Sequence, residues 1–509
     1  VGFAEDEINK LDAVASYRRG DITANAEHPM LMKSLMFVSV EAARAWNAVA
    51  PAASRVSDEA ALRLPNVLFG ALTVVPLYLL AACFFERRTA LLAAAFWAVG
   101  VNAITYNRIA KEDTLLVFFV LLATYFYVRA KKTSGFEAAR KRRFYILSGA
   151  SFGLMLASKY FPHYFGLVML YQHLVPLRQR EPGEPRGTTP RVFFVVIFVA
   201  FLAANPAILL PQTWEYLRAY AGEELLTHHG YLMGERLYDN VMSKTPFGAT
   251  PVYFYLLFLA IKVPLAILAA AAIGLCVAAR RWREPGPAFL LLMTVLWVVP
   301  FSLAGAKWLR YALSLMPLVY MLAAVGVVWL VRRGASLLKG RDGQGSPHAP
   351  AVVGALAVVV FVAAPAVFAY RAMPHYALYT NALGAGRAGH FFPHDEFYDD
   401  GLREAIARVA ESAPRGSTLA HETPGVARHY LARFGRTDIE SRVISDPRFD
   451  ARDTRGTTYF ILQRGRTYFE NREELEAVRR AGRKEHEVFV RGASAAEVYV
   501  VGAALAARE

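Results

Sequence analysis

Long apolar runs constrain this chain more than any other feature. Roughly 17–25 apolar residues span the hydrocarbon core of a bilayer, and runs of that length recur between residues 63 and 370. Hydrophobic residues make up 55% of the 509 positions. We therefore predict a polytopic α-helical membrane protein with about ten visible spans. The predicted spans cover residues 63–85, 89–106, 114–128, 145–158, 161–177, 192–210, 252–279, 287–303, 311–331 and 351–370.

The positive charge follows these spans. A net charge of +15 raises nucleic-acid binding as a function, but residues 372–509 are close to neutral. The excess lies in short loops between spans, and it argues for a membrane protein with no nucleic-acid partner. Loops rich in Arg and Lys alternate with poorer ones, which assigns the rich loops to the cytoplasm. The basic loops are 86–88, 129–143, 178–191, 280–283 and 332–341.

This assignment fixes the sidedness of every other segment. Residues 1–60, the loop 211–251 and the chain after residue 371 are then outside the cytoplasm. An opening segment on that side requires translocation, so we expect one further span before Val1, which makes about eleven. The expected location is the plasma membrane, the inner membrane of a bacterium, with an extracytoplasmic C-terminal domain.

The tail has the pattern of a separate small α/β domain. We divide the chain into a transmembrane domain, 1–371, and an extracytoplasmic domain, 372–509, which has an ordinary domain size. It contains no glycine loop of the nucleotide-binding kind. Helical patterns cover 401–411, 425–434 and 472–480, and short strands are predicted at 417–420, 458–462, 488–490 and 497–501.

The opening segment is loaded with ionisable residues. Glu5, Asp6 and Glu7 are consecutive, and a Glu27-His28-Pro turn precedes Lys33 and an amphipathic stretch. A solvated surface loop is the ordinary interpretation of such a charge run. The alternative is that the acids serve chemistry at the membrane surface.

A second group of candidates is cationic and lies at the outer ends of the spans, a side otherwise depleted of positive charge. Snorkelling to lipid headgroups accounts for one or two of them. A convergent set requires an anion, and a lipid phosphate is the natural one. Glu112 and Asp113 are close in sequence, and ionisable residues at membrane depth are functional candidates by default. The cations are Arg63, Arg108, Lys111, Lys159, Lys307 and Arg310.

The loop 211–251 supplies the last candidates. His228 and His229 are adjacent, so they do not share one helix face as metal ligands usually do. The two cysteines, Cys83 and Cys276, lie inside apolar runs without metal-ligand spacing. An aromatic cluster, 253–255, opens the next span, where interfacial anchoring is its default role.

These pieces, in this order, resemble the protein O-mannosyltransferases and their bacterial relatives, including the aminoarabinose transferases, which are glycosyltransferases of the C-type fold. The resemblance covers about residues 1–330. Asp6-Glu7 is similar to the family's Asp-Glu motif. His28 to Lys33 is similar to its His-Pro-Pro-Leu-Gly-Lys motif, from which Met30 and Met32 depart. The further similar segments are Arg63-Leu64-Pro65-Asn66, Arg108-Ile109-Ala110 with Asp113, Gly234-Glu235, Tyr253-Phe254-Tyr255, Lys262-Val263-Pro264 and Lys307 to Tyr311.

The resemblance implies an inverting transferase, mannosyltransferase-like, that moves a sugar from a polyprenyl-phosphate donor to a hydroxyl of a protein, lipid or glycan. Asp6 would be the general base, with Glu7 beside it. No cofactor is implied as a requirement; some aminoarabinose transferases carry a divalent metal, for which Glu27 and His228 are the candidates. Cations would stabilise the leaving phosphate: Arg63, Arg108, Lys159, Lys307 and Arg310. Residues that would orient the acceptor or the loop are His28, Lys33, Asp113, His228, Tyr231 and Glu235.

Two other classes of protein remain open. A lipid or glycan transporter favours ionisable residues near the bilayer centre and paired broken helices, whereas the charges here cluster at one face. A non-catalytic subunit of a membrane complex, with decayed transferase motifs, agrees with the departures at Met30 and Met32. The retained Asp6, His28 and Arg108 argue against it.

Overall fold

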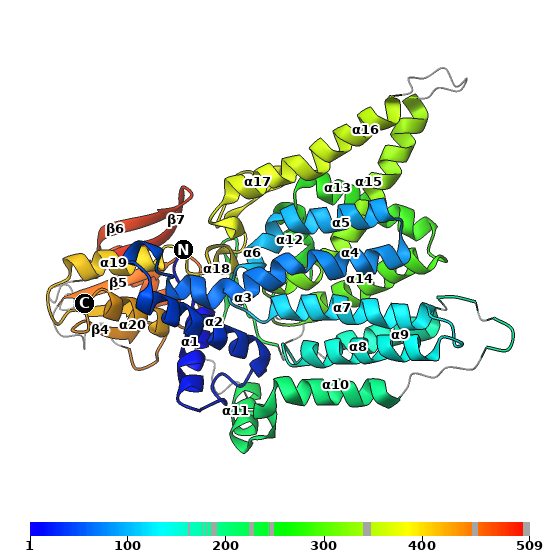
Figure 1. The fold of residues 1–509 in the computed structure, drawn as a ribbon. Helices are drawn as coiled ribbons and strands as arrows, with labels where there is room; N and C mark the ends of the chain where they lie inside the picture. Colours follow the sequence, from blue (N-terminus) through cyan, green and yellow to red (C-terminus); the bar gives the residue numbers. More distant parts are fainter. Residues whose placement is uncertain are drawn as a thin grey trace.

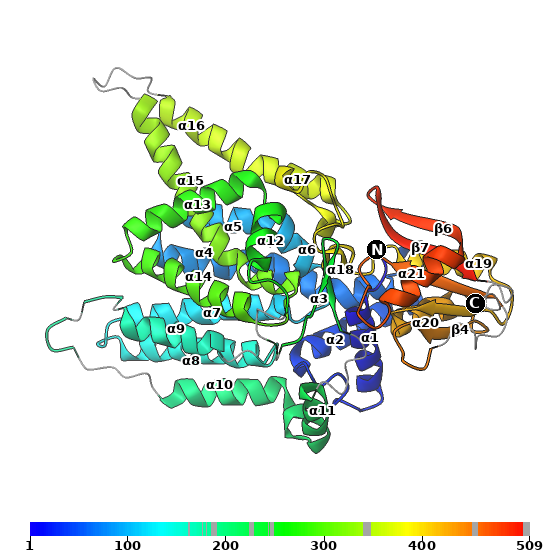
Figure 2. The same cartoon turned by 180° about the vertical axis from the view of Figure 1, so that it is seen from behind.

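The structure is a computed structural model that describes residues 1–160, 163–175, 177–179, 181–184, 191–222, 229–242, 244, 249–338, 348–449 and 457–501. A bundle of long helices forms one end of the molecule, and a five-stranded sheet with its helices forms the other (Figure 1). The first two helices, α1 (Glu5–Arg18) and α2 (Met30–Val49), lie between the bundle and the sheet region in both views (Figure 2).

Among the described residues, helix covers most of each predicted span, which confirms the helical membrane fold. Residues 161, 162 and 176 of the predicted span 161–177 lie outside the described residues. Among the described residues, five helices are long and apolar enough to cross a membrane: Ala52–Phe84, Asp113–Lys132, Pro285–Leu303, Met316–Leu338 and Ala351–Ala372. A sixth is counted if α5 (Arg87–Val99) and α6 (Val101–Asn107), bent by 57°, are one span. The bundle helices are α3 (Asp58–Leu72), α4 (Val74–Phe84), α7 (Asp113–Lys132), α8 (Ala138–Leu156), α9 (His163–Leu174), α10 (Arg191–Ala204), α12 (Phe254–Lys262), α13 (Leu265–Arg280), α14 (Pro285–Leu303), α15 (Met316–Leu338), α16 (Ala349–Val358) and α17 (Ala364–Ala372).

The other predicted spans fall short of that criterion for local reasons. The first turns of α8 carry Arg140 to Arg143, so its apolar part is short. The predicted span 252–279 is broken into α12 and α13 at Pro264, whose ring removes a backbone donor. A π-helical turn, Val359–Ala363, joins α16 to α17 just before Pro365, where the helical hydrogen bonds must rearrange.

Small residues allow the closest helix packing in the bundle. A Cβ atom on Gly274 of α13 would lie 1.8 Å from the carbonyl oxygen of Leu322 on α15, and one on Gly326 would lie 2.0 Å from that of Ala270. Association of helices in lipid depends on such close backbone approach, because apolar surface alone gives no preference there. The pair α13–α15 therefore forms a fixed support beneath the segment that carries Arg310.

Short elements connect the bundle to the sheet region. They include the hairpin β1 (Tyr231–Met233) and β2 (Arg236–Tyr238), helix α11 (Pro211–Ala221) and the 3-10 segment η3 (Leu309–Ser314). After α17 the chain runs through a short helix, α18 (Pro393–Phe397), toward α1. The remaining 3-10 turns are η1 (Ala52–Ser54), η2 (Pro206–Leu209), η5 (Tyr376–Leu378) and η6 (Ala382–Gly384).

The C-terminal region is a mixed sheet in the order β4-β3-β5-β7-β6, with β3 parallel to β4 and β5 and with β7 antiparallel to β5 and β6. All the predicted helices and strands of this region are present. Strand β4 was not predicted, because its polar sequence is exposed at a sheet edge. The elements are α19 (Leu402–Ser412), β3 (Thr418–His421), α20 (Pro424–Arg433), β4 (Glu440–Val443), β5 (Thr458–Gln463), α21 (Arg472–Ala481), β6 (Arg483–Val490) and β7 (Ala493–Val501).

Candidate active site between the first helix and the helix ends

The three consecutive acids begin a helix and do not lie in a loop. Negative side chains stabilise the first turn of a helix, where the backbone N–H groups have no intrahelical partner. Glu7 accepts a hydrogen bond from the backbone N–H of Ala4 at 3.1 Å, so it also caps α1. Because the three side chains leave one helical turn in different directions, each meets a different environment.

Glu7 is fixed by protein partners on both oxygens. The Arg63 side chain donates to it from Nε at 2.7 Å and also pairs with it through Nη2, and the Ala110 N–H donates at 3.0 Å. The Glu7 side chain is 1% exposed. With its acceptor sites occupied and no solvent access, Glu7 ties α1 to α3 and to the turn after α6.

Asp6 keeps an open side and has cations on the other. Its Oδ1 lies 3.1 Å from Lys111 Nζ, its Oδ2 lies 3.3 Å from Arg310 Nη1, and the Tyr398 hydroxyl donates to Oδ2 at 2.6 Å. About a third of the side chain, 32%, is exposed. Although burial acts to raise the pKa of Asp6, the two cations and the Tyr398 hydrogen bond hold it well below its usual range.

A third cation joins this cluster through an aromatic ring. Lys159, which follows α8, pairs with Asp113 at 2.6 Å and lies 4.5 Å from the centre of the Tyr311 ring. The Arg310 guanidinium lies 5.6 Å from the same ring. Lys111 and Arg310 therefore lie beside Asp6, and Lys159 joins them through the Tyr311 ring, although the three residues come from different parts of the chain. We call Asp6, Lys111, Lys159 and Arg310 the Asp6 cluster.

Arg108 lies on the far side of Glu7. Together with Arg63, Glu7, Tyr398 and other residues, it lines a small pocket of about 20 Å³. The Arg108 guanidinium lies 5.4 Å from the Tyr376 ring, and its buried Nε has no hydrogen-bond partner among the described residues. The Arg108 guanidinium thus has fewer protein partners than the Arg63 guanidinium.

Two predicted lysines have structural partners instead. Lys307 is fully buried and donates to the carbonyl oxygens of Thr250 and Ala304 at 2.7 and 2.6 Å. Lys33 donates to the carbonyl oxygens of residues 24, 25 and 28 and so fixes the turn that carries His28. Neither ammonium contacts the Asp6 cluster in the structure, and both hold loops in place.

A second buried charge cluster lies beside the first. Lys10 Nζ pairs with Glu112 at 2.6 Å, and His28 Nε2 lies 3.7 Å from the same carboxylate. The Lys10 and Glu112 side chains are 1% and 0% exposed. Burial, with help from Lys10 and Lys111, holds the pKa of His28 well below its usual value, so the ring is neutral at pH 7. Lys10 was not predicted, because nothing in its sequence neighbourhood distinguishes it.

The loop candidates lie further away. The Tyr231 hydroxyl donates to Asp395 of α18, and Asp395 also accepts from the Leu309 N–H at 3.1 Å. Glu235 is exposed at the turn of the β1–β2 hairpin. His228 lies outside the described residues. Among the described residues, no group of three or more His, Cys, Asp and Glu side chains is arranged to hold a metal ion.

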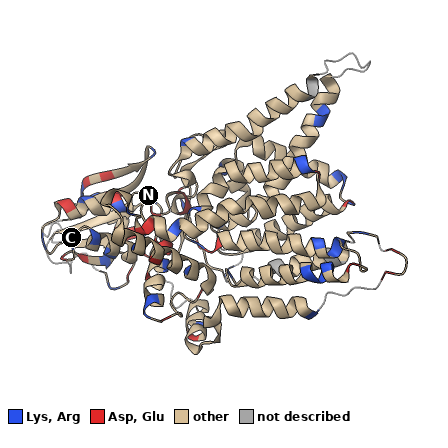
Figure 3. Ribbon diagram, in the orientation of Figure 1, with Lys and Arg blue, Asp and Glu red and all other residues tan. Residues whose placement is uncertain are grey.

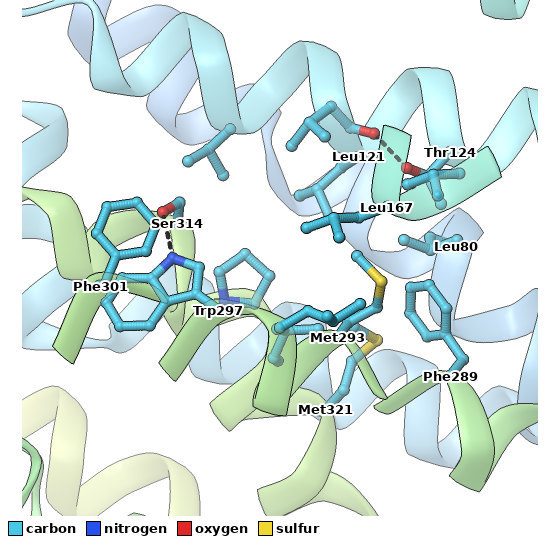
Figure 4. Close-up of a pocket in the computed structure, with 16 residues that line it drawn as sticks. Leu80, Leu121, Thr124, Leu167, Phe289, Met293, Trp297, Phe301, Ser314 and Met321 are labelled. Carbon is cyan, nitrogen blue, oxygen red and sulfur yellow. Dashed lines mark hydrogen bonds between the residues drawn. The ribbon is translucent and has the colours of Figure 1, made fainter. Parts of the chain in front are cut away.

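A narrow apolar cavity of about 50 Å³ lies among α4, α7, α9, α14 and α15. Its lining includes Leu121, Leu167 and Met293, and the Trp297 indole donates to Ser314 Oγ at 2.8 Å (Figure 4). Ser314 belongs to η3, the segment that also carries Arg310. The Phe301 ring on the cavity wall lies 5.9 Å from the Tyr311 ring, which in turn borders Lys159 and Arg310.

Comparison with known proteins agrees with this architecture. Residues 49–210 match the family model described as dolichyl-phosphate-mannose-protein mannosyltransferase. The fold is similar to that of ArnT from Cupriavidus metallidurans in the apo state, with a TM-score of 0.51, 16% identity, and coverage of 100% of this chain and 95% of that one. No curated protein matches the sequence.

A weaker likeness extends to a second protein. The oligosaccharyltransferase of Archaeoglobus fulgidus aligns with a TM-score of 0.46 and 10% identity, over 81% of this chain and 55% of that one.

Proposed function

This chain is a multi-pass membrane protein of the C-type glycosyltransferase fold, and we propose that it transfers a sugar from a polyprenyl phosphate to a hydroxyl group. One observation carries the proposal: the partly exposed Asp6 carboxylate lies beside Lys111 and Arg310, and an apolar cavity reaches η3, the segment that carries Arg310. A base next to an anion site, with apolar space behind it, matches the parts of a lipid-phosphate sugar donor.

The transfer follows from this arrangement. Asp6 accepts the proton of the acceptor hydroxyl as its oxygen forms a bond to the anomeric carbon. The bond between that carbon and the phosphate oxygen breaks, and the electron pair leaves with the phosphate, so the configuration inverts. Lys111, Lys159 and Arg310 stabilise the charge that develops on the phosphate.

The same cations link donor binding to the strength of the base. Lys111 and Arg310 lower the pKa of Asp6 in this structure, which makes its carboxylate a weak proton acceptor. A phosphate that draws these two cations toward itself raises the basicity of Asp6. On this proposal the base becomes effective when the donor is in place.

The donor's lipid chain begins along the apolar cavity and continues into the bilayer. The cavity walls are aliphatic and aromatic, and the cavity ends at η3, which carries Arg310 and Tyr311 (Figure 4). Burial of apolar surface supplies affinity without directionality, and the phosphate contacts then fix the reacting carbon. The family match to residues 49–210 makes a mannosyl donor the first to test. A protein, lipid or glycan hydroxyl is the acceptor.

The proposed orientation places the reaction outside the cytoplasm. Basic side chains gather at the end of the bundle opposite to α1 and the sheet region (Figure 3). Under the positive-inside rule that end faces the cytoplasm, and the Asp6 cluster and C-terminal region face the opposite side. The membrane is the plasma membrane, the inner one in a bacterium.

Replacement of Asp6 tests the function. Asp6→Asn keeps the shape of the side chain and its hydrogen-bonding oxygen but removes the base, so transfer from labelled undecaprenyl-phosphate mannose in proteoliposomes should fall at least about 100-fold. Asp12→Asn, on the exposed face of the same helix, is the matched control and should retain full activity. Undiminished turnover in Asp6→Asn would exclude Asp6 as the base.

A further inference from the structure

The contact of Tyr398 with Asp6 joins residues 392 positions apart. Tyr398 belongs to the segment after the last span, beyond the part of the chain in which the transferase motifs were recognised. Its hydroxyl donates to Asp6 Oδ2 at 2.6 Å, and the phenol is partly buried. Of the three partners of Asp6, it is the only neutral one.

The backbone at this position is unusual. Tyr398 has φ 47° and Asp399 has φ 63°, both in the left-handed region. A residue with a Cβ atom pays roughly 1–2 kcal/mol for that conformation, and such residues persist where the surroundings over-determine them. A tyrosine has no local hydrogen bond to offer in compensation, so tertiary contacts must hold this turn.

Asp399 makes those contacts, and one of them is with helix α1, which carries Asp6. Asp399 accepts from Gln463 at 2.9 Å and from Arg466 Nε at 2.8 Å, both in the sheet region, and from the backbone N–H of Glu5 at 3.0 Å. Arg466 also donates to the Glu5 carboxylate at 2.7 Å. The turn therefore attaches the sheet region to the first turn of α1, one residue from Asp6.

We propose that Tyr398 is a positioning residue for Asp6, so that the C-terminal region supplies part of the transferase site. This inference rests on the proposed function. The hydroxyl holds Oδ2 on the side of Arg310 and leaves the rest of the carboxylate open for the acceptor. When the cations turn to the donor phosphate, Tyr398 remains as the contact that keeps the base in line with the anomeric carbon.

The test uses the full-length protein and the variant Tyr398→Phe, which removes only the hydroxyl. Loss of a hydrogen bond to a charged group should lower kcat about tenfold. The KM for undecaprenyl-phosphate mannose should stay unchanged, because the donor's cations are intact. A general loss of structure would instead alter KM and the melting temperature as well. Tyr379→Phe is the matched control, since its ring packs on Phe368, 6.2 Å between centres.

A second readout does not require activity. Carbodiimides react with protonated carboxyl groups, and loss of the Tyr398 donor raises the pKa of Asp6. The rate of Asp6 labelling, followed by peptide mass spectrometry, should rise about tenfold for a shift of about one unit. Asp12, whose side chain is exposed on the same helix and is remote from Tyr398, is the internal standard.

The outcomes separate the two proposals. Faster labelling of Asp6 together with a lower kcat supports the positioning role. Unchanged labelling, or an unchanged kcat, overturns it while the proposed function stands on Asp6→Asn. Full turnover in Asp6→Asn overturns the proposed function, and with it any role of Tyr398 in transfer.

Discussion

The two ends of the helical bundle carry ion pairs of opposite character. At the basic end most partners are exposed: Arg332 and Glu86 are 67% and 40% exposed, and Arg281 and Glu284 are 56% and 49% exposed. The pair Arg178–Glu184 is the exception, at 21% and 4%. At the end that faces α1 the partners are buried. The Lys10–Glu112, Lys159–Asp113 and Lys262–Glu396 pairs are all less than 10% exposed.

The exposed charges at the basic end set the orientation of the spans, whereas the buried charges at the other end form the candidate active site. Exposed pairs in water contribute little to stability and constrain no geometry, yet their sign is enough to orient spans. Buried pairs cost desolvation and persist only with well-placed partners. Burial therefore identifies the end of the bundle at which chemistry is expected, independently of any motif.

The largest effect on stability should come from breaking a buried pair. Glu112→Gln leaves the Lys10 ammonium without its counter-ion at 1% exposure, which should cost about 3–5 kcal/mol and lower the melting temperature in detergent. Glu86→Gln, at the basic end, should cost less than about 1 kcal/mol. Adding Lys10→Met to Glu112→Gln should recover most of the loss. Equal losses at the two ends would break the comparison.

Arg310 should affect catalysis more than stability. Arg310→Ala removes one of the cations beside Asp6, and kcat/KM for undecaprenyl-phosphate mannose should fall about 100-fold. The KM for the acceptor should change much less, because the guanidinium contacts the leaving group. Arg332→Ala is the control at the basic end and should leave both constants unchanged. An unchanged donor dependence in Arg310→Ala would remove it from the phosphate site.

Local pattern was sufficient to predict most of the fold. Among the described residues each predicted span is largely helical, and strands β3 and β5 lie within one residue of their predicted bounds, because hydrophobic runs and alternation report local burial. Strand β7 ends where predicted but begins four residues earlier. Edge strand β4 lacks that signal. Breaks such as the one at Pro264 shorten the helices, which is why fewer of them meet the length criterion than were predicted.

The sequence pattern predicted only some of the residues of the candidate site. The proximity of Asp6 to Lys111 and Arg310 follows from shared sidedness, since all three lie at one end of the spans. Tyr398 and Lys10 have no comparable signal, because their contacts depend on how distant segments pack. Arg63 and Lys307 lie at the predicted end of the bundle but do not join the Asp6 cluster. Arg63 pairs with Glu7, and Lys307 donates to backbone carbonyl oxygens.

Glu422 extends the comparison to a buried carboxylate held by neutral groups. It is 3% exposed and accepts hydrogen bonds from Asn471 and Ser445, each at 2.7 Å. Burial raises its pKa to about 7 from 4.5, although these hydrogen bonds and the charge of Arg466 act to lower it. The folded state thus binds the proton more tightly than the unfolded state, so stability is highest below about pH 4.5 and declines as the pH rises toward 7.

Between pH 5.5 and 7.5 the wild type should lose about 2 kcal/mol through this group. Glu422→Gln has nothing to titrate there and should be insensitive over the same range, as measured by thermal unfolding at each pH. Glu440→Gln, on the exposed edge strand, is the control and should follow the wild type. A carboxylate whose pKa is lowered by a neighbouring cation, such as Asp6, stabilises the folded protein more as the pH rises. Glu422 stabilises it less as the pH rises. A wild-type profile that rises or stays flat relative to Glu422→Gln would therefore show that burial does not dominate the pKa of Glu422.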